Sequence, residues 1–161
     1  MKTPPLGQVL AMSGADFFAY GAELMLTHAP HPTDQPVLVR MVRLGIRPGE
    51  RFSADGAGTA AAAAIAAAPE AAQRRMLAAE PRLNPVFDGW SCPRSGMGVY
   101  GTNYLLRAVI AKIGLGANLP EDAVYPVAYQ DAHGEVPSGD NDYVLHFAAD
   151  ALPPADAFWS V

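Results

Sequence analysis

Residues 98–126 read GVYGTNYLLRAVIAKIGLGANLPEDAVYP and join a helix-forming run, a glycine-rich loop and the start of an extended segment. Thr102 can cap a helix, because its hydroxyl accepts a hydrogen bond from an amide of the first turn. Gly114 follows the last apolar residue, where a left-handed backbone often ends a helix. Between them, large aliphatic residues recur at helical spacing: Leu105, Leu106, Val109, Ile110 and Ile113. We therefore predict a helix over residues 103–113 that buries its apolar side against a sheet or other helices.

The composition of the chain is that of a globular protein. Of its 161 residues, 50% are hydrophobic and 17% are charged, which excludes a chain that is disordered throughout. The formal net charge is −5 and no basic stripe interrupts the sequence, so we expect no nucleic-acid partner. The single cysteine, Cys92, cannot form a disulfide within the chain and leaves the redox compartment open.

Targeting and membrane segments are not expected in this chain. Residues 1–8 hold one lysine and no apolar run, so we expect no signal peptide at its start. The alanine-rich run at residues 59–68 is far shorter than the roughly 20 apolar residues that a membrane helix needs. We therefore expect no transmembrane segment, and the sequence leaves the localisation unknown.

Residues 1–85 are expected to form a helical region. Ser13 can cap a first helix over about residues 13–28. Thr33 and Asp34 can cap a second helix over about residues 34–44. The short proline-containing connection between the two helices favours an antiparallel helical hairpin.

A third helical segment is expected over about residues 59–79. Its alanines favour a helix but carry little packing information, because identical methyl groups fit many registers. Pro69 either opens a second helical piece, which we favour, or kinks one long helix.

Residues 86–161 show a different pattern. Residues 86–99 mix glycine and proline with large side chains, which is typical of a linker or an extended lead-in. Three later segments have the apolar pattern of strands: about residues 123–130, 142–148 and 157–161. A few short strands with an apolar face need more sheet or another layer to cover them. The fold class is therefore α+β, with an N-terminal helical region followed by the strands of an incomplete antiparallel sheet.

Several stretches resemble a known bacterial family. GVYGTNYLLRAVIAKIGLGANLPEDAVYP, DYVLHF and LPPADAFWSV are similar to the opening of the module called domain of unknown function 1214. Residues 15–52, ADFFAYGAELMLTHAPHPTDQPVLVRMVRLGIRPGERF, resemble the helical segment that precedes that module and follows a partner module, domain of unknown function 1254. The resemblance implies a jelly-roll-like β-sandwich. Relatives usually carry further strands, and many are exported, so this chain resembles a truncated member or a fragment.

Arg107 is the charged residue that most invites a functional interpretation. It lies on the predicted helix near Tyr104, with Trp90 upstream. An arginine beside aromatic rings can bind a carboxylate or a sugar-like ligand through its planar fork and through stacking. The alternative, which we favour, is a structural ion pair with a loop carboxylate such as Asp122.

Other candidate sites have plain structural alternatives. His28 and His31 could join a metal site, but the prolines beside them break the regular spacing of a rigid ligand pair. The acidic loop around Asp131 lacks the ligand order of a calcium loop and is more typical of a solvated turn. Cys92 has no catalytic motif around it. We therefore assign no catalytic residue, no metal site and no cofactor.

Two functions from different classes remain. The first is a non-catalytic, envelope-associated module that binds a ligand or partner, because no catalytic constellation is visible in the sequence. The second is part of a hydrolase whose active site needs strands beyond this chain. A third hypothesis is that the chain, being truncated, has no independent function, and we then expect poor solubility or self-association through an open sheet edge near Trp159.

Overall fold

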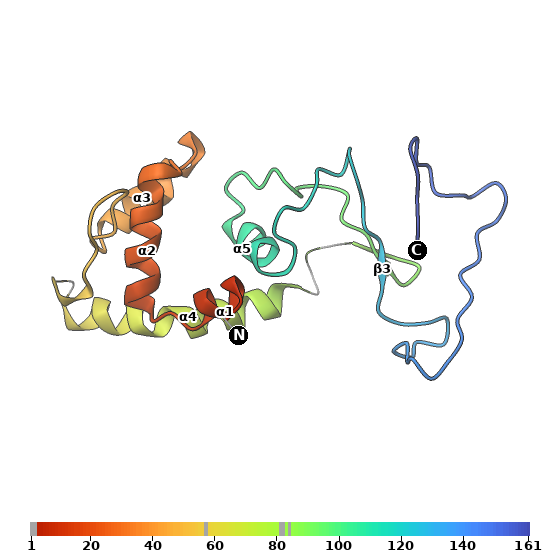
Figure 1. Ribbon diagram of the computed structural model, residues 1–161, viewed down its shortest axis with the longest axis horizontal. Helices are drawn as coiled ribbons and strands as arrows, with labels where there is room; N and C mark the ends of the chain where they lie inside the picture. Colours follow the sequence, from red (N-terminus) through yellow and green to blue (C-terminus); the bar gives the residue numbers. More distant parts are fainter. Residues whose placement is uncertain (1–2, 57, 81–82, 84) are drawn as a thin grey trace.

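The computed structural model of the chain describes residues 3–56, 58–80, 83 and 85–161. Within these residues the fold is α+β, with helices over the N-terminal half and one small antiparallel sheet after it (Figure 1). The elements in chain order are α1 (Pro5–Leu10), α2 (Gly14–Thr27), η1 (Pro32–Asp34), α3 (Gln35–Val42), η2 (Ala54–Gly56), α4 (Thr59–Ala79), β1 (Val86–Phe87), β2 (Trp90–Ser91), α5 (Tyr104–Ile113) and β3 (Val127–Ala128). No helix of the described part combines the length and apolarity needed to cross a membrane.

The core of the helical region lies where α2, α4 and the chain after α3 meet. Its buried side chains are Ala22, Ile46, Phe52 and Ile65, with Phe18 and Met41 among the residues packed around them. These residues come from segments that are far apart in sequence, so burial of their apolar surface is what holds the helices together.

The crossing of α2 and α4 depends on a glycine and a proline. Gly14, at the start of α2, lies against the backbone carbonyl of Ile65 in α4, and a Cβ atom at position 14 would collide with that oxygen. Pro69 lies four residues after Ile65 and has no amide hydrogen to bond that carbonyl. The helix nevertheless continues through Pro69, so α4 is one helix over Thr59–Ala79. Of the two alternatives for Pro69, the structure shows the single long helix.

The start of α3 differs from the expected Asp34 cap. Residues 32–34 form the turn η1, which is capped by the ring of His31 through a hydrogen bond from the Thr33 amide to Nδ1, 3.2 Å long. Asp34 precedes α3 but makes no side-chain cap bond, because its carboxylate is engaged elsewhere. The α-helix itself covers Gln35–Val42, and Gly45 follows it with a left-handed φ of 78°.

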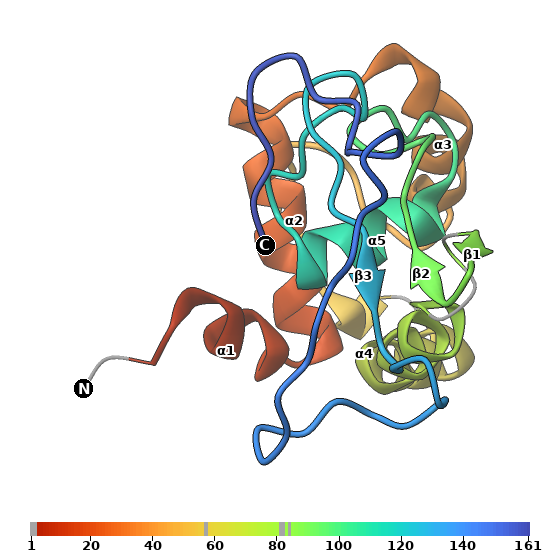
Figure 2. The ribbon, with the colours of Figure 1, turned by 90° about the vertical axis from the view of Figure 1, so that its right-hand side faces the viewer.

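The helix α5 occupies the predicted segment, but its caps differ from the expected ones. Asn103 rather than Thr102 is the N-cap, and its side chain accepts a hydrogen bond of 3.1 Å from the Leu106 amide. Gly114 ends the helix at a φ of −152°, so it is not the expected left-handed residue. Leu106, Val109 and Ile110 are buried. In Figures 1 and 2, α5 lies between the helical region and the sheet.

The sheet contains the residues expected to be a lead-in. The strands β1 and β2 form a hairpin, and β2 also pairs with β3, giving the order β1-β2-β3. Asp88 and Gly89 join β1 to β2 with φ values of 48° and 81°. Two positive φ values in a two-residue turn match the right-handed twist of adjacent strands, which explains why a hairpin forms here.

The expected strands differ from the observed ones beyond β3. Only Val127–Ala128 of the predicted strand at 123–130 is paired, and neither 142–148 nor 157–161 forms a strand. A strand needs a neighbour for its backbone groups, and no neighbour pairs with these segments in the described chain. In Figure 2 this C-terminal segment runs over the sheet side of the molecule as a long irregular chain. Within this segment the rings of Phe147 and Trp159 pack edge to face, with their centroids 5.2 Å apart.

Candidate functional site

Arg107 joins α5 to the helical region through a two-pronged ion pair with Asp34. Its Nη2 lies 3.0 Å from Asp34 Oδ1, and its Nη1 lies 3.3 Å from Oδ2. Nη2 also donates to the carbonyl oxygen of Gly101, 2.8 Å away. A planar guanidinium that meets a carboxylate in this way fixes direction as well as distance. The pair therefore orients α5 relative to η1.

Both partners of the ion pair favour their charged forms. The hydrogen bond from Arg107 holds the pKa of Asp34 below its ordinary value of 3.8, although burial acts in the opposite direction. The same carboxylate raises the pKa of Arg107. Asp34 is only 6% exposed, whereas the Arg107 side chain is 39% exposed. The pair is thus charged at neutral pH and open to solvent on its arginine side.

Tyr104 lies against the same ion pair. The Arg107 Cζ atom is 5.1 Å from the centroid of the Tyr104 ring, a distance typical of a cation–π contact. The Tyr104 hydroxyl oxygen is buried and has no regular hydrogen bond to any described residue. It is still close enough to Asp34 to contribute to the lowered pKa of that carboxyl. We call Asp34, Tyr104 and Arg107 the α5 anchor.

The α5 anchor differs from the sequence expectation in one partner. Arg107 pairs with Asp34, not with the loop residue Asp122. The sequence gives no signal for this choice, because Asp34 also suits a helix cap. The guanidinium of Arg107 is therefore occupied by groups of the protein itself. They are the Asp34 carboxylate, the Gly101 carbonyl and the Tyr104 ring.

Trp90 lies apart from the other two ligand-binding candidates. It is in β2, where its Cα partners are Phe87 on one side and Ala128 on the other, and its exposed fraction is 36%. The structure brings Tyr104 and Arg107 together and places Trp90 in the sheet. Ligand binding by these three residues stays a prediction.

A second feature is an open groove of about 440 Å³ between α5 and the sheet. One wall comes from the end of α5 and the loop that follows it, with Ile110 and Ile113. The other wall comes from Ser91 of β2 and from β3 and its neighbours, with Tyr125 and Val127. Most of the lining is apolar, and sequence reasoning missed this groove because β1 and β2 were not expected to be strands.

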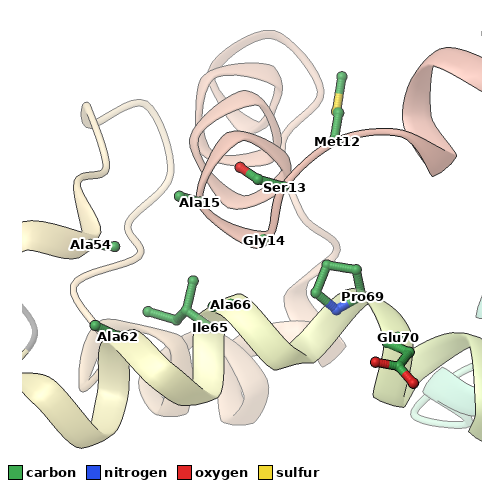
Figure 3. A pocket seen from close by; sticks show the side chains of 10 residues that line it. All are labelled: Met12, Ser13, Gly14, Ala15, Ala54, Ala62, Ile65, Ala66, Pro69 and Glu70. Carbon is green, nitrogen blue, oxygen red and sulfur yellow. The ribbon is translucent and has the colours of Figure 1, made fainter.

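A smaller hollow of about 340 Å³ lies at the crossing of α2 and α4. Figure 3 shows that small side chains line much of it, with Ile65 and Pro69 on α4 facing the start of α2. Its polar lining groups already have partners: Ser13 caps α2 through the Asp16 amide, and Glu70 pairs with Arg74. The hollow follows from the close approach of the two helices and contains no reactive arrangement.

The remaining polar candidates have structural roles. Among the described residues, no three His, Cys, Asp or Glu side chains are placed to hold a metal ion. The carboxylate of Asp131 accepts hydrogen bonds from the amides of His133 and Glu135, at 2.8 and 3.0 Å, which close a turn. These two amides, that of Glu135 first, lower the pKa of Asp131. Cys92 is buried and is not in a disulfide.

The comparison with known proteins gives a match that covers β3 and the segment that follows it. Residues 122–161 match the family model described as "Protein of unknown function (DUF1214)", as the resemblance in the sequence implies. No curated protein and no solved structure matches the chain. The matched residues include β3, part of the groove wall and the whole irregular C-terminal segment. The similarity to this family therefore covers residues 122–161 of the 161 residues of the chain.

Proposed function

We propose that the chain is a non-catalytic, envelope-associated module that binds a partner or ligand through the apolar face of residues 114–161. We call this face the C-terminal surface. It includes one wall of the groove, the free edge of β3 and the irregular segment that follows β3.

The observation that carries this proposal is the exposure of apolar side chains. Every residue after Ile110 is at least partly exposed. The large apolar side chains include Tyr125 at 62%, Val144 at 93% and Phe158 at 81% exposed. Large exposed apolar areas are uncommon on a protein that works alone and typically mark an interaction site.

The edge of the sheet supports the same interpretation. The strand β3 pairs with β2 on one side only, so its other side presents unpaired backbone groups. Such an edge can accept an additional strand from a partner or from a second copy of the chain. Envelope association rests on the resemblance to exported relatives.

We test the proposal by sedimentation velocity of the full chain over a range of concentrations. A lysine in an edge strand discourages the addition of another strand, so Val127→Lys is the test variant. We expect the wild-type chain to associate as its concentration rises, and Val127→Lys to weaken that association by about tenfold or more.

The matched control is Leu77→Lys, which places the same charge at an exposed apolar position of α4. This variant is expected to associate like the wild type. A loss of association of equal size in both variants would contradict binding through the C-terminal surface, whereas a wild-type chain that stays monomeric at every concentration would contradict a second copy of the chain as the partner.

A further inference from the structure

The charges of the chain are divided between its two parts. Residues 1–112 contain all of its lysines and arginines, whereas residues 113–161 contain acidic residues and neither lysine nor arginine. The C-terminal surface is therefore strongly acidic as well as apolar. Of its acidic residues, all but Asp131 are exposed: Glu121, Asp122, Glu135, Asp140, Asp142, Asp150 and Asp156.

A basic and apolar surface lies on α3 and the loop after it. Leu38 and Met41 point towards the core, which leaves the opposite face of the helix outward. That outward face exposes Val39 at 58%, and Val42, at its margin beside Leu38, is 39% exposed. We call it the α3 surface and define it by Val39, Arg40, Val42, Arg43, Arg47 and Arg51, all exposed.

Within the described chain, only one arginine of the α3 surface forms an ion pair with an acidic residue. Arg47 meets Glu50 at 3.6 Å, and both side chains are well exposed. Arg40, Arg43 and Arg51 have no ion-pair partner among the described residues. The surface therefore presents net positive charge next to exposed valines, which suits an acidic and apolar partner.

A segment with the matching character is present in the same chain. Asp140 and Asp142 are exposed and come directly before Tyr143, Val144 and Leu145, whose exposed fractions are 48%, 93% and 42%. This segment thus has two negative charges beside apolar side chains. The α3 surface has two positive charges, Arg40 and Arg43, beside Val39 and Val42, so the two are complementary in charge. Figure 1 shows α3 at one end of the long axis and the C-terminal segment at the other, so one molecule does not bring them together.

We propose that the α3 surface of one molecule binds residues 140–145 of a second copy. The inference rests on the proposed binding role of the C-terminal surface and names the surface that it meets. A single contact of this kind leaves one surface of each kind free, so association closes reciprocally between two copies, closes as a ring or continues as an open chain.

The experiment is sedimentation velocity of the full chain at low and at high salt, with charge-reversal variants. Arg40→Glu with Arg43→Glu is expected to weaken association by about tenfold or more at low salt. Adding Asp140→Arg and Asp142→Arg to that variant restores opposite charges across the contact and is expected to recover most of the lost affinity. High salt is expected to weaken the wild type, because it screens exposed charges.

The control with the same change of charge is Arg74→Glu with Arg75→Glu, on the exposed side of α4. It is expected to associate like the wild type. Circular dichroism of each variant shows whether the helix content of the chain is retained, so a loss of association is interpreted only for a folded chain.

The outcomes separate this inference from the proposed function. If Val127→Lys weakens association while Arg40→Glu with Arg43→Glu does not, the role of the C-terminal surface stands and its docking on α3 is refuted. The absence of any rescue by Asp140→Arg with Asp142→Arg also refutes it. Binding of the α3 arginines to vesicles of anionic lipid, without self-association at any concentration, would refute it in favour of a membrane surface.

Discussion

At the scale of residues, the fold depends on a few side-chain contacts that could not be predicted from the sequence. Arg107 could be recognised as unusual because it lies beside aromatic residues on a predicted helix. Which carboxylate it meets could not be predicted, because Asp34 precedes it by 73 positions and also suited a helix cap. Only the tertiary arrangement of η1 and α5 chooses between these two roles.

The ion pair between Asp34 and Arg107 predicts a dependence of stability on pH. Asp34 has a lower pKa in the folded chain than its ordinary value of 3.8, so its contribution is fully present above about pH 3.8 and is lost as the pH falls through the lowered folded value. Asp34→Asn is expected to be less stable at neutral pH and to lose less stability on acidification. Urea unfolding at a series of pH values measures both effects.

A double-mutant cycle supplies the control for this prediction. If the contact itself stabilises the fold, Asp34→Asn and Arg107→Met are non-additive, and the double variant is less destabilised than the sum of the single ones. Additive effects, or an acid profile of Asp34→Asn identical to that of the wild type, would show that the carboxylate acts through something other than this pair.

At the scale of elements, the sequence indicates helices better than strands. The helical segments carry apolar residues at a period that belongs to the helix itself, so α2, α3, α4 and α5 lie close to the ranges expected for them. Strands depend on a partner elsewhere. Alternation at residues 142–148 was therefore not enough to form one, because no paired neighbour is present there.

The hairpin of β1 and β2 has a local signal in the sequence. Asp88-Gly89 lies between Phe87 and Trp90, and an Asp-Gly pair flanked by large apolar residues is among the best short-range signals of a two-residue hairpin turn. The overall glycine and proline content of residues 86–99 favours a lead-in, but the local Asp-Gly pair is the better predictor of their structure. The groove could not be foreseen without this hairpin.

The contact of α2 with α4 leads to a prediction about two glycines of the same helix. Gly14→Ala places a Cβ atom against the Ile65 carbonyl and is expected to cost about 1–3 kcal/mol of unfolding free energy. Gly21→Ala meets nothing within 4 Å, so alanine is expected to stabilise the helix by about 0.5–1 kcal/mol. Chemical denaturation of both variants measures the two free energies.

Opposite signs for the two substitutions are the diagnostic result. Because both place alanine in α2, helix propensity alone predicts a gain at each position. A gain in stability for Gly14→Ala would mean that α2 and α4 do not approach each other as closely as described here.

At the scale of the whole molecule, α5 lies between two different environments. On one side it packs against α4, with Lys112 donating to Gln73 at 2.7 Å, and the α5 anchor ties it to η1. On the other side, Ile110 and Ile113 line the open groove next to the sheet. The helical region thus has a packed core, whereas the C-terminal surface is covered by nothing in the described chain.

Hydrogen–deuterium exchange at low and at high protein concentration tests this division most directly. We expect the amides of α5 to be protected at both concentrations, and those of residues 127–161 to exchange fast when dilute and slowly once the chains associate. Exchange of α5 as fast as that of residues 127–161, or strong protection of residues 127–161 in the dilute monomer, would contradict a buried helix beside an uncovered binding surface.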